Sequence, residues 1–299
     1  MKKIAVIGGS GMVASRFIDL SSDRLDLTSL DEKTLDITDR NAVEKYFSEN
    51  KFDSIINFAA YTSVDGAEAQ KGDESGLVWR LNVGGPKNLA EVCKSNNIFL
   101  VHISTDFVFP GDEKYPGPYC EDAKLPETPE GIGWYGWTKN RAEAEIMKSG
   151  IKCAIVRYGY PFRAAIYDKK KDWARNLISL YNEQKLYPLF DDQIHSVLFI
   201  DDLAEPLTKI LNEELEGVFH IASSDTTTPY EVGSYLLEKY TGKKVEIQKG
   251  SLAEFLKIPG KAPRSRLGGL NVEKTESKLG MKFRSWREMV DEFITQLMS

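Results

Sequence analysis

The stretch that decides the fold is Lys3-Ile4-Ala5-Val6-Ile7-Gly8-Gly9-Ser10-Gly11-Met12-Val13-Ala14, an apolar run that enters a glycine-rich loop and then a helix-length segment. Gly8 permits a tight turn, Gly11 lets the backbone approach a phosphate, and Ala14 is small enough for a helix to pack on the strand. The helix N-terminus would offer unpaired N–H groups and a partial positive charge. The pattern predicts a dinucleotide-binding loop, and a glycine-rich turn without ligand is the alternative.

The first 150 residues alternate short apolar runs with amphipathic segments of helical length, which is typical of a parallel sheet covered on both faces. Strands are expected at 3–7, 25–30, 54–58, 99–104 and 152–158, and helices at 11–20, 39–49, 82–95 and 137–147. The sequence therefore predicts an α/β fold with a Rossmann-type, doubly wound parallel sheet.

Beyond Arg157 the pattern loosens, with a helix expected at 173–183 and a charged run at 169–172. Two further strands, 197–200 and 218–221, flank a helix at 201–212 and should complete the sheet. We therefore expect an NAD(P)-binding Rossmann domain made of 1–158 with 185–222, and a smaller C-terminal substrate-binding lobe made of 159–184 with 223–299.

Composition excludes several classes of protein. The 299 residues carry 39 Lys and Arg against 45 Asp and Glu, a net charge of −6, which disfavours nucleic acid as a partner. No stretch is apolar for long enough to span a membrane, and the apolar run after Lys2-Lys3 is too short for a signal sequence. The three cysteines contain no C-x-x-C pair, so neither a disulfide framework nor a metal site is expected. These features favour a cytoplasmic protein.

Asp31 lies at the end of the second predicted strand, roughly twenty residues beyond the glycine loop. A carboxylate at this point holds the ribose diol of the adenosine and repels a 2′-phosphate. The cofactor is therefore expected to be NADH or NADPH, with NADH favoured, although the nearby Lys33 would soften that preference.

Tyr135 and Lys139 are one helical turn apart, and Ser104-Thr105-Asp106 closes an apolar strand. Moving a phenol from a pKa near 10 to about 7 requires about 4 kcal/mol. A cation about 4 Å away supplies about that amount at an effective dielectric constant of 20. We therefore expect Lys139 to lower the pKa of Tyr135, whereas a surface pair on a helix is the structural alternative.

At this point the sequence resembles the extended short-chain dehydrogenase/reductase family, and within it the dTDP-4-dehydrorhamnose reductases. The resemblance covers nearly the whole chain. It is carried by Leu35-Asp36-Ile37-Thr38-Asp39, Asn57-Phe58-Ala59-Ala60-Tyr61-Thr62-Ser63-Val64-Asp65, Leu81-Asn82-Val83-Gly84-Gly85-Pro86, Ser104-Thr105-Asp106-Phe107-Val108-Phe109, Tyr135-Gly136-Trp137-Thr138-Lys139 and Asp201-Asp202-Leu203-Ala204.

The resemblance implies a role for each matching position. The cofactor would be bound by Gly8, Gly11, Met12, Val13, Asp31, Asp36, Ile37, Ala59, Ala60, Tyr61, Thr62, Asn82, Tyr135 and Lys139. Thr105, Tyr135 and Lys139 would be catalytic, while Thr105, Asp106 and Tyr160 would contact the sugar.

The implied reaction is hydride transfer to the 4-keto carbon of a nucleotide-linked deoxysugar, as in the formation of dTDP-rhamnose for cell-surface polysaccharides. Tyr135 would donate the proton, Thr105 would orient the carbonyl, and Lys139 would hold the nicotinamide ribose. Related dehydratases carry Asp-Glu directly after the threonine, whereas Asp106-Phe107 stands here, so dehydration is not expected.

Three departures from the family pattern fall on the sugar side: His195 with an apolar pair within 191–198, Arg264-Ser265 in place of Arg-Pro, and a long loop between Thr105 and Tyr135. Two alternatives to reduction therefore stay open. One is a nucleotide-sugar epimerase on the same scaffold. The other is a non-catalytic dinucleotide-binding regulator, like the beta subunit of methionine adenosyltransferase. The resemblance also suggests a homodimer.

Overall fold

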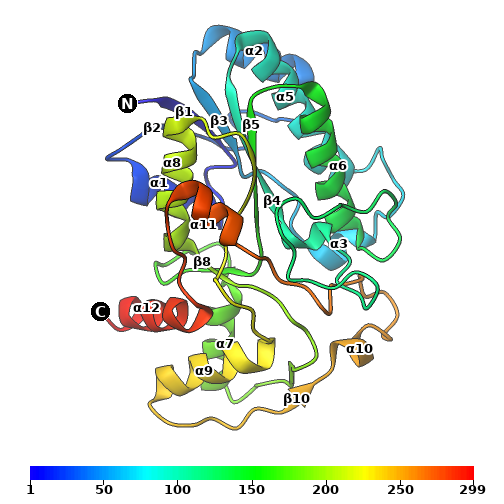
Figure 1. Cartoon of the computed structure of the whole chain (residues 1–299), viewed down its shortest axis with the longest axis vertical. Coiled ribbons are helices and arrows are strands. Elements are labelled where there is room, and N and C mark those ends of the chain that lie inside the picture. Colours follow the sequence, from blue (N-terminus) through cyan, green and yellow to red (C-terminus); the bar gives the residue numbers. More distant parts are fainter.

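The computed structural model describes residues 1–299 and is centred on a six-stranded parallel sheet (Figure 1). Its strands follow the order β2-β1-β3-β4-β5-β9. Their bounds are β1 Lys3–Ile7, β2 Asp26–Leu30, β3 Ser54–Asn57, β4 Phe99–Thr105, β5 Cys153–Tyr158 and β9 Gly217–His220. This sheet confirms the predicted fold class. Because all six strands run in parallel, their carboxyl ends meet at one edge, where open α/β sheets bind ligands.

Helices cover both faces of the sheet (Figure 1). On one face α1 (Met12–Ser21) and α8 (Ala204–Glu213) contribute Phe17 and Leu207 to a buried core. On the other face lie α2 (Arg40–Glu49), α5 (Gly85–Asn96) and α6 (Trp134–Ser149). A strand that is covered on both faces must be apolar throughout, which explains the apolar runs in the sequence.

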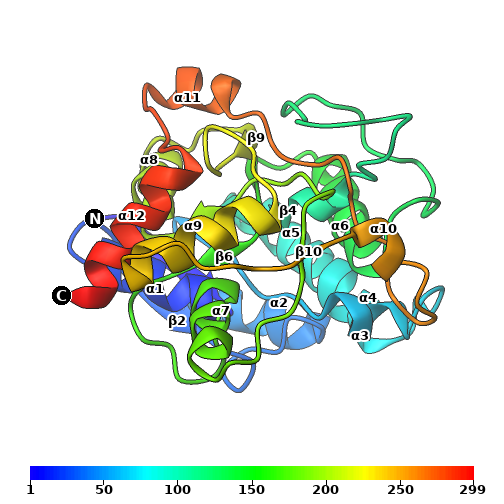
Figure 2. The same ribbon diagram turned by 90° about the horizontal axis from the view of Figure 1, so that it is seen from below.

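A smaller lobe lies beyond the carboxyl edge and contains α7 (Trp173–Asn182), α9 (Pro229–Thr241) and α12 (Trp286–Met298), which Figure 2 shows in the foreground. It has its own core, in which Phe162, Phe199 and Phe293 pack together. The remaining elements are α3 (Val64–Glu68), α4 (Leu77–Trp79), a π-helical turn (Arg80–Gly84), 3-10 turns at Asp106–Val108 and Ile200–Leu203, α10 (Leu252–Phe255) and α11 (Glu273–Leu279).

One expected strand does not join the central sheet. The 197–200 segment forms only β8 (Leu198–Phe199), which pairs with β6 (Pro161–Phe162) in a separate two-stranded sheet. The free side of β5 is taken by β9, and Phe199 is instead buried against Phe162 and Phe293. A second short pair, β7 (Leu189–Phe190) with β10 (Lys249–Gly250), also belongs to the lobe.

Helix α6 is held on the sheet by a buried ion pair. The Glu143 carboxylate accepts hydrogen bonds from Arg157 on β5, with Nη2 to Oε2 at 2.6 Å and Nε to Oε1 at 3.0 Å. Ser104 on β4 donates its hydroxyl to the same carboxylate. The two charged side chains are only 1% and 3% exposed, so each depends on the other for its charge to be compensated.

We predict that Glu143→Gln destabilises the protein by about 3–5 kcal/mol, because it leaves the Arg157 charge buried without a counter-ion. Glu145→Gln is the matched control: it removes a partly exposed pair on the same helix, with Lys87 at 3.7 Å, and should cost less than about 1 kcal/mol. Urea denaturation of both variants measures the difference. Equal losses would show that the buried pair contributes no more than a surface one.

Candidate active site

A cleft of about 860 Å³ opens at the carboxyl edge of the sheet, above the glycine loop. It brings together most of the residues singled out in the sequence. The lining includes Gly8, Gly11, Met12, Val13, Asp31, Asp36, Ile37, Ala59, Ala60, Thr62, Thr105, Tyr135, Lys139 and Tyr160. Tyr61, Asn82 and Asp106 do not line it.

The loop after β1 has the shape that a pyrophosphate requires. Gly8 has a φ of +73°, and a Cβ on it would lie 2.8 Å from the backbone nitrogen of Ala59, so no larger residue fits. Helix α1 begins at Met12 with Gly11 as its N-cap, and no side chain caps it. The first N–H groups of the helix therefore have no partner within the helix and are available to an anion. These features fit the diphosphate of a dinucleotide.

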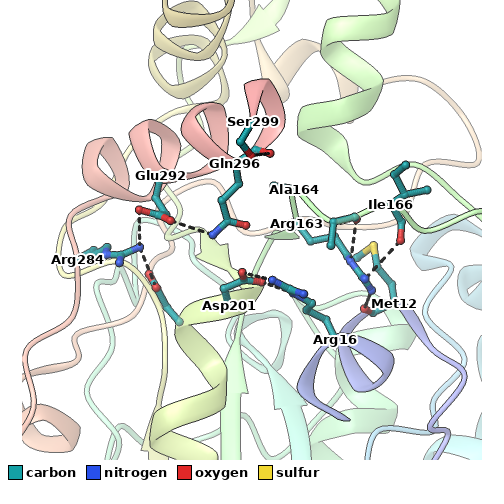
Figure 3. A network of polar contacts seen from close by, with 12 residues as sticks. Met12, Arg16, Arg163, Ala164, Ile166, Asp201, Arg284, Glu292, Gln296 and Ser299 are labelled. Carbon is teal, nitrogen blue, oxygen red and sulfur yellow. Dashed lines mark hydrogen bonds and ion pairs between the residues drawn. The ribbon is translucent and has the colours of Figure 1, made fainter. Parts of the chain in front are cut away.

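A segment that follows β6 crosses this loop and was not predicted from the sequence. The buried Arg163 donates from Nη1 to the Met12 carbonyl at 2.8 Å, and the same nitrogen reaches Ser15 Oγ at 3.0 Å. Figure 3 shows Arg163 beside Met12. Tyr167 donates its hydroxyl to the Ser10 carbonyl at 2.9 Å. The first turn of α1 is therefore held by residues that lie some 150 positions later in the chain.

On the other side of α1, Arg16 forms two hydrogen bonds with the Asp201 carboxylate, at 2.7 and 2.6 Å, as Figure 3 shows. Beyond it, Arg284 lies between Asp202, at 3.2 Å, and Glu292 on α12, at 3.9 Å. The first ion pair connects α1 with the 3-10 turn Ile200–Leu203, which precedes α8. The second connects the same turn with α12 of the lobe. The position of the first turn of α1 thus depends on both parts of the molecule.

Asp31 is partly exposed directly after β2, where the ribose of the adenosine is expected. Its Oδ1 accepts hydrogen bonds from the Thr34 backbone and side chain, both at 3.0 Å, and from the Lys33 backbone at 3.1 Å. These bonds hold the pKa of Asp31 below its ordinary value, the Thr34 backbone N–H having the largest effect. All three bonds go to one oxygen, so Oδ2 remains as an acceptor for a diol.

Asn82 acts behind the cleft instead of lining it. Its Oδ1 accepts from the Tyr61 backbone N–H at 2.7 Å, and its Nδ2 donates to the Tyr61 carbonyl at 3.2 Å and to Thr138 Oγ1 at 3.0 Å. The Tyr61 ring packs against an apolar cluster around Trp134 and Trp137. Asn82 therefore fixes the backbone of the 59–62 segment relative to α6.

Thr105 and Tyr135 meet because α6 approaches the end of β4 very closely. A Cβ on Gly136 would lie 2.1 Å from the Phe107 carbonyl oxygen, so only glycine allows this contact. Burial raises the pKa of Tyr135 to about 12, and a hydrogen bond with the Thr105 side chain opposes that shift. The phenol is therefore neutral, with its proton on the oxygen, at every physiological pH.

The expectation that Lys139 lowers the pKa of Tyr135 does not hold in this structure. Lys139 Nζ donates to the Ile103 carbonyl at 2.6 Å and lies 3.1 Å from His102 Nε2, so it is bonded to β4. Burial lowers the pKa of Lys139 itself to about 8, while the charge of Glu143 opposes this. Burial is the largest cause of both pKa shifts, and neither group contributes to the shift of the other.

Tyr160 lies in the part of the cleft where the sugar is expected, and its backbone has a φ of +45°, a conformation that costs energy in a residue with a side chain. Its ring packs on His195 with centroids 4.1 Å apart, and its hydroxyl accepts a hydrogen bond from Gln193 Nε2 at 2.8 Å. Both ring nitrogens of His195 are buried without a partner. Asp106 lies behind Tyr160, where burial raises its pKa to about 7.

No cluster of three or more His, Cys, Asp or Glu side chains has the geometry of a metal site. None of the helices combines the length and the apolar character needed to cross a lipid bilayer.

A dinucleotide cleft lined by a threonine, a tyrosine and a lysine places the chain among the NAD(P)-dependent oxidoreductases of the short-chain dehydrogenase/reductase type. The comparison with family models is more specific. The model of the RmlD substrate binding domain matches residues 1–299, and the chain belongs to that family.

Several relatives cover nearly the whole chain. A dTDP-4-dehydrorhamnose reductase of Mycobacterium tuberculosis is 26% identical over 288 residues, 96% of this chain and 90% of the relative. A dTDP-4-keto-6-deoxy-D-glucose reductase of Streptomyces niveus is 30% identical over 230 residues, 76% of this chain and 75% of its own. Among solved structures, a dTDP-4-dehydrorhamnose reductase of Bacillus anthracis in complex with NADP has a TM-score of 0.86, with 26% identity and 99% of each chain covered.

We predict that Asp106→Asn flattens the pH dependence of stability. The folded state raises the pKa of Asp106 to about 7, so it retains a proton that the unfolded chain has already lost. Stability is therefore lost as pH rises from about 4 to about 7, and the neutral asparagine escapes this loss. Urea denaturation at pH 5 and pH 8 should show the wild type weakening relative to Asp106→Asn. A constant difference between the two would contradict the burial of a protonated carboxyl.

We also predict that Asp31→Ala improves the use of NADPH relative to NADH about tenfold, since it removes a charge that repels a 2′-phosphate. Glu32→Ala, a neighbouring acid at the same end of the cleft, is the control and should change the ratio little. The KM values for both cofactors measure the effect. An unchanged ratio in Asp31→Ala would remove Asp31 from the ribose site.

Proposed function

We propose that this protein reduces the 4-keto group of a dTDP-linked 6-deoxyhexose, with dTDP-4-dehydrorhamnose as substrate and dTDP-rhamnose as product. The observation that carries the proposal is the pairing of Thr105 with a neutral Tyr135 in the lining of the dinucleotide cleft. Reduction of a ketone needs a proton donor next to the carbonyl oxygen, and a phenol with a raised pKa holds that proton until the alkoxide forms.

The proposed roles follow from the positions of these residues. When bound, the nicotinamide supplies the hydride. Tyr135 holds the proton at its phenol oxygen and delivers it to the oxygen of the former ketone, while the Thr105 hydroxyl orients that oxygen. Gly11, Met12 and Val13 would bind the diphosphate, Asp31 the adenosine ribose, and Tyr160 the sugar.

Phe107 supports reduction over elimination of water. Its ring lies 5.8 Å from that of Tyr135 and 6.1 Å from that of Tyr160, measured between centroids, so an aromatic wall stands where a dehydratase would need a second acid. Apolar contact also excludes water from the reacting carbonyl.

We further propose that the division into a Rossmann domain, 1–158 with 185–222, and a substrate-binding lobe, 159–184 with 223–299, corresponds to these two roles. The separate lobe core around Phe162 and Phe293 supports it, with one refinement: β7 and Phe199 of β8 also pack in the lobe core. A homodimer remains part of the proposal by resemblance alone.

We predict that Tyr135→Phe lowers turnover about 10²–10⁴-fold and leaves NADH affinity within about twofold, because it removes one proton and little contact area. The assay follows NADH oxidation by absorbance with dTDP-4-keto-6-deoxy-L-lyxo-hexose, and NADH binding by fluorescence. Tyr181→Phe on α7, outside the cleft, is the control and should keep wild-type turnover.

Wild-type turnover in Tyr135→Phe would overturn the mechanism. If the wild-type protein binds NADH but does not oxidise it with this sugar, the substrate is another keto sugar or the chain is an epimerase or a dinucleotide-binding regulator. An epimerase would retain tightly bound NAD through purification and consume no reductant.

A further inference from the structure

Three buried polar side chains form a continuous chain behind the cleft. Asn57 at the end of β3 lies 3.3 Å from His102 on β4, measured from Nδ2 to Nδ1. His102 Nε2 lies 3.1 Å from Lys139 Nζ on α6. All three side chains are at most 2% exposed, so no bulk water competes for these contacts. Their hydrogen atoms must therefore be arranged consistently among themselves.

One end of this chain has a fixed polarity. The Ala59 backbone N–H donates to Asn57 Oδ1 at 3.0 Å, and a backbone N–H can only donate. The oxygen of the Asn57 amide must therefore face Ala59, and its NH₂ group must face His102. His102 Nδ1 then accepts a hydrogen bond, which places the proton of the neutral imidazole on Nε2.

The other end of the chain follows from this polarity. The Nε2–H of His102 points at Lys139 Nζ, and an ammonium group has no lone pair to accept it. A neutral amine does, and it retains two N–H groups, one for the Ile103 carbonyl at 2.6 Å and one for the cleft. We propose that Asn57 and His102 present an N–H donor to Lys139 and thereby favour its amine over its ammonium form, which makes His102 a positioning residue for the reduction. This inference rests on the proposed function and adds a determinant to the same site.

The other charged and titratable groups around Lys139 do not reverse this preference. On α6, Glu143 favours the ammonium form, but its charge is already compensated by Arg157 on β5. Burial raises the pKa values of Tyr135 on α6 and of Tyr158 on β5, so both phenols are neutral, and burial also raises that of Asp106 after β4. Burial of Lys139 lowers its own pKa to about 8, in the same direction as the contact with His102.

The imidazole of His102 tests this arrangement directly, in the free protein and without substrate. In protein with ¹⁵N-labelled histidine at pH 9, two-bond ¹H–¹⁵N spectra should show His102 protonated on Nε2 only. His220 is an internal reference with the opposite tautomer, because its Nδ1 faces the Asn271 carbonyl at 3.0 Å and its Nε2 faces Arg157 Nη1 at 3.3 Å. The chain has only three histidines, and the missing signal in His102→Gln identifies His102. A His102 protonated on Nδ1 would overturn the proposal.

The consequence for catalysis is measured by the pH profile of kcat/KM. Asn57→Asp replaces the NH₂ donor by a carboxylate that accepts from Nδ1–H, so the imidazole reverses and Nε2 accepts from an ammonium group. The ammonium form of Lys139, which offers the cleft one more N–H donor than the amine, then persists to higher pH, so the loss of activity at alkaline pH should move upward by one pH unit or more. His220→Gln is the control, because this buried histidine contacts Arg157 and not Lys139, and it should move the profile less than Asn57→Asp does.

An unmoved profile in Asn57→Asp would contradict the proposal, as would an equal shift in the control. The tautomer of His102 in the wild-type protein decides the matter even if a variant fails to fold. It also separates this proposal from the proposed function, since the tautomer does not depend on which sugar is reduced.

Discussion

The ion pair between Glu143 and Arg157 is the constraint on which the arrangement of the site depends. A carboxylate 1% exposed is tolerated only where a counter-charge and hydrogen-bond donors meet it, and Arg157 and Ser104 provide these from two neighbouring strands. The pairing fixes how α6 is rotated about its axis. Lys139 and Tyr135 precede Glu143 by one and two helical turns, so they lie on the same face of the helix, against the ends of β4 and β5.

Short-range sequence patterns were sufficient to predict the main elements of the cofactor-binding half of the molecule. The glycine loop, the strand before it and Asp31 all follow from short-range patterns, because the groups proposed to meet the phosphate and the ribose are consecutive backbone groups and one side chain at a strand end. The starts of two lobe helices are also marked in the sequence. Thr228 with Glu231 and Ser285 with Glu288 form capping boxes at α9 and α12, a signal visible in the sequence alone.

Other features depend on contacts between distant residues. The role of Lys139 could not be inferred from its distance to Tyr135 along the helix, since His102 and the Ile103 carbonyl reach it from a strand some 36 residues earlier. The pairing of β8 with β6 is of the same kind, because the edge of β5 was taken by β9. On the sugar side, Gln193 and His195 reach Tyr160 across the sequence, and nothing local marks them as neighbours.

The position of β9 in the chain also has a consequence for the order in which the protein assembles during synthesis. Strand β5 ends at residue 158, yet its second neighbour is made of residues 217–220, so one edge of the sheet stays open while the intervening residues emerge. An exposed parallel edge is a template for pairing with other chains. The lobe segment around Arg163, which donates a hydrogen bond to the first turn of α1, is synthesised within that same interval. Nascent chains that end before residue 220 therefore carry a complete glycine loop on an unfinished sheet, and they are the species most exposed to misassembly.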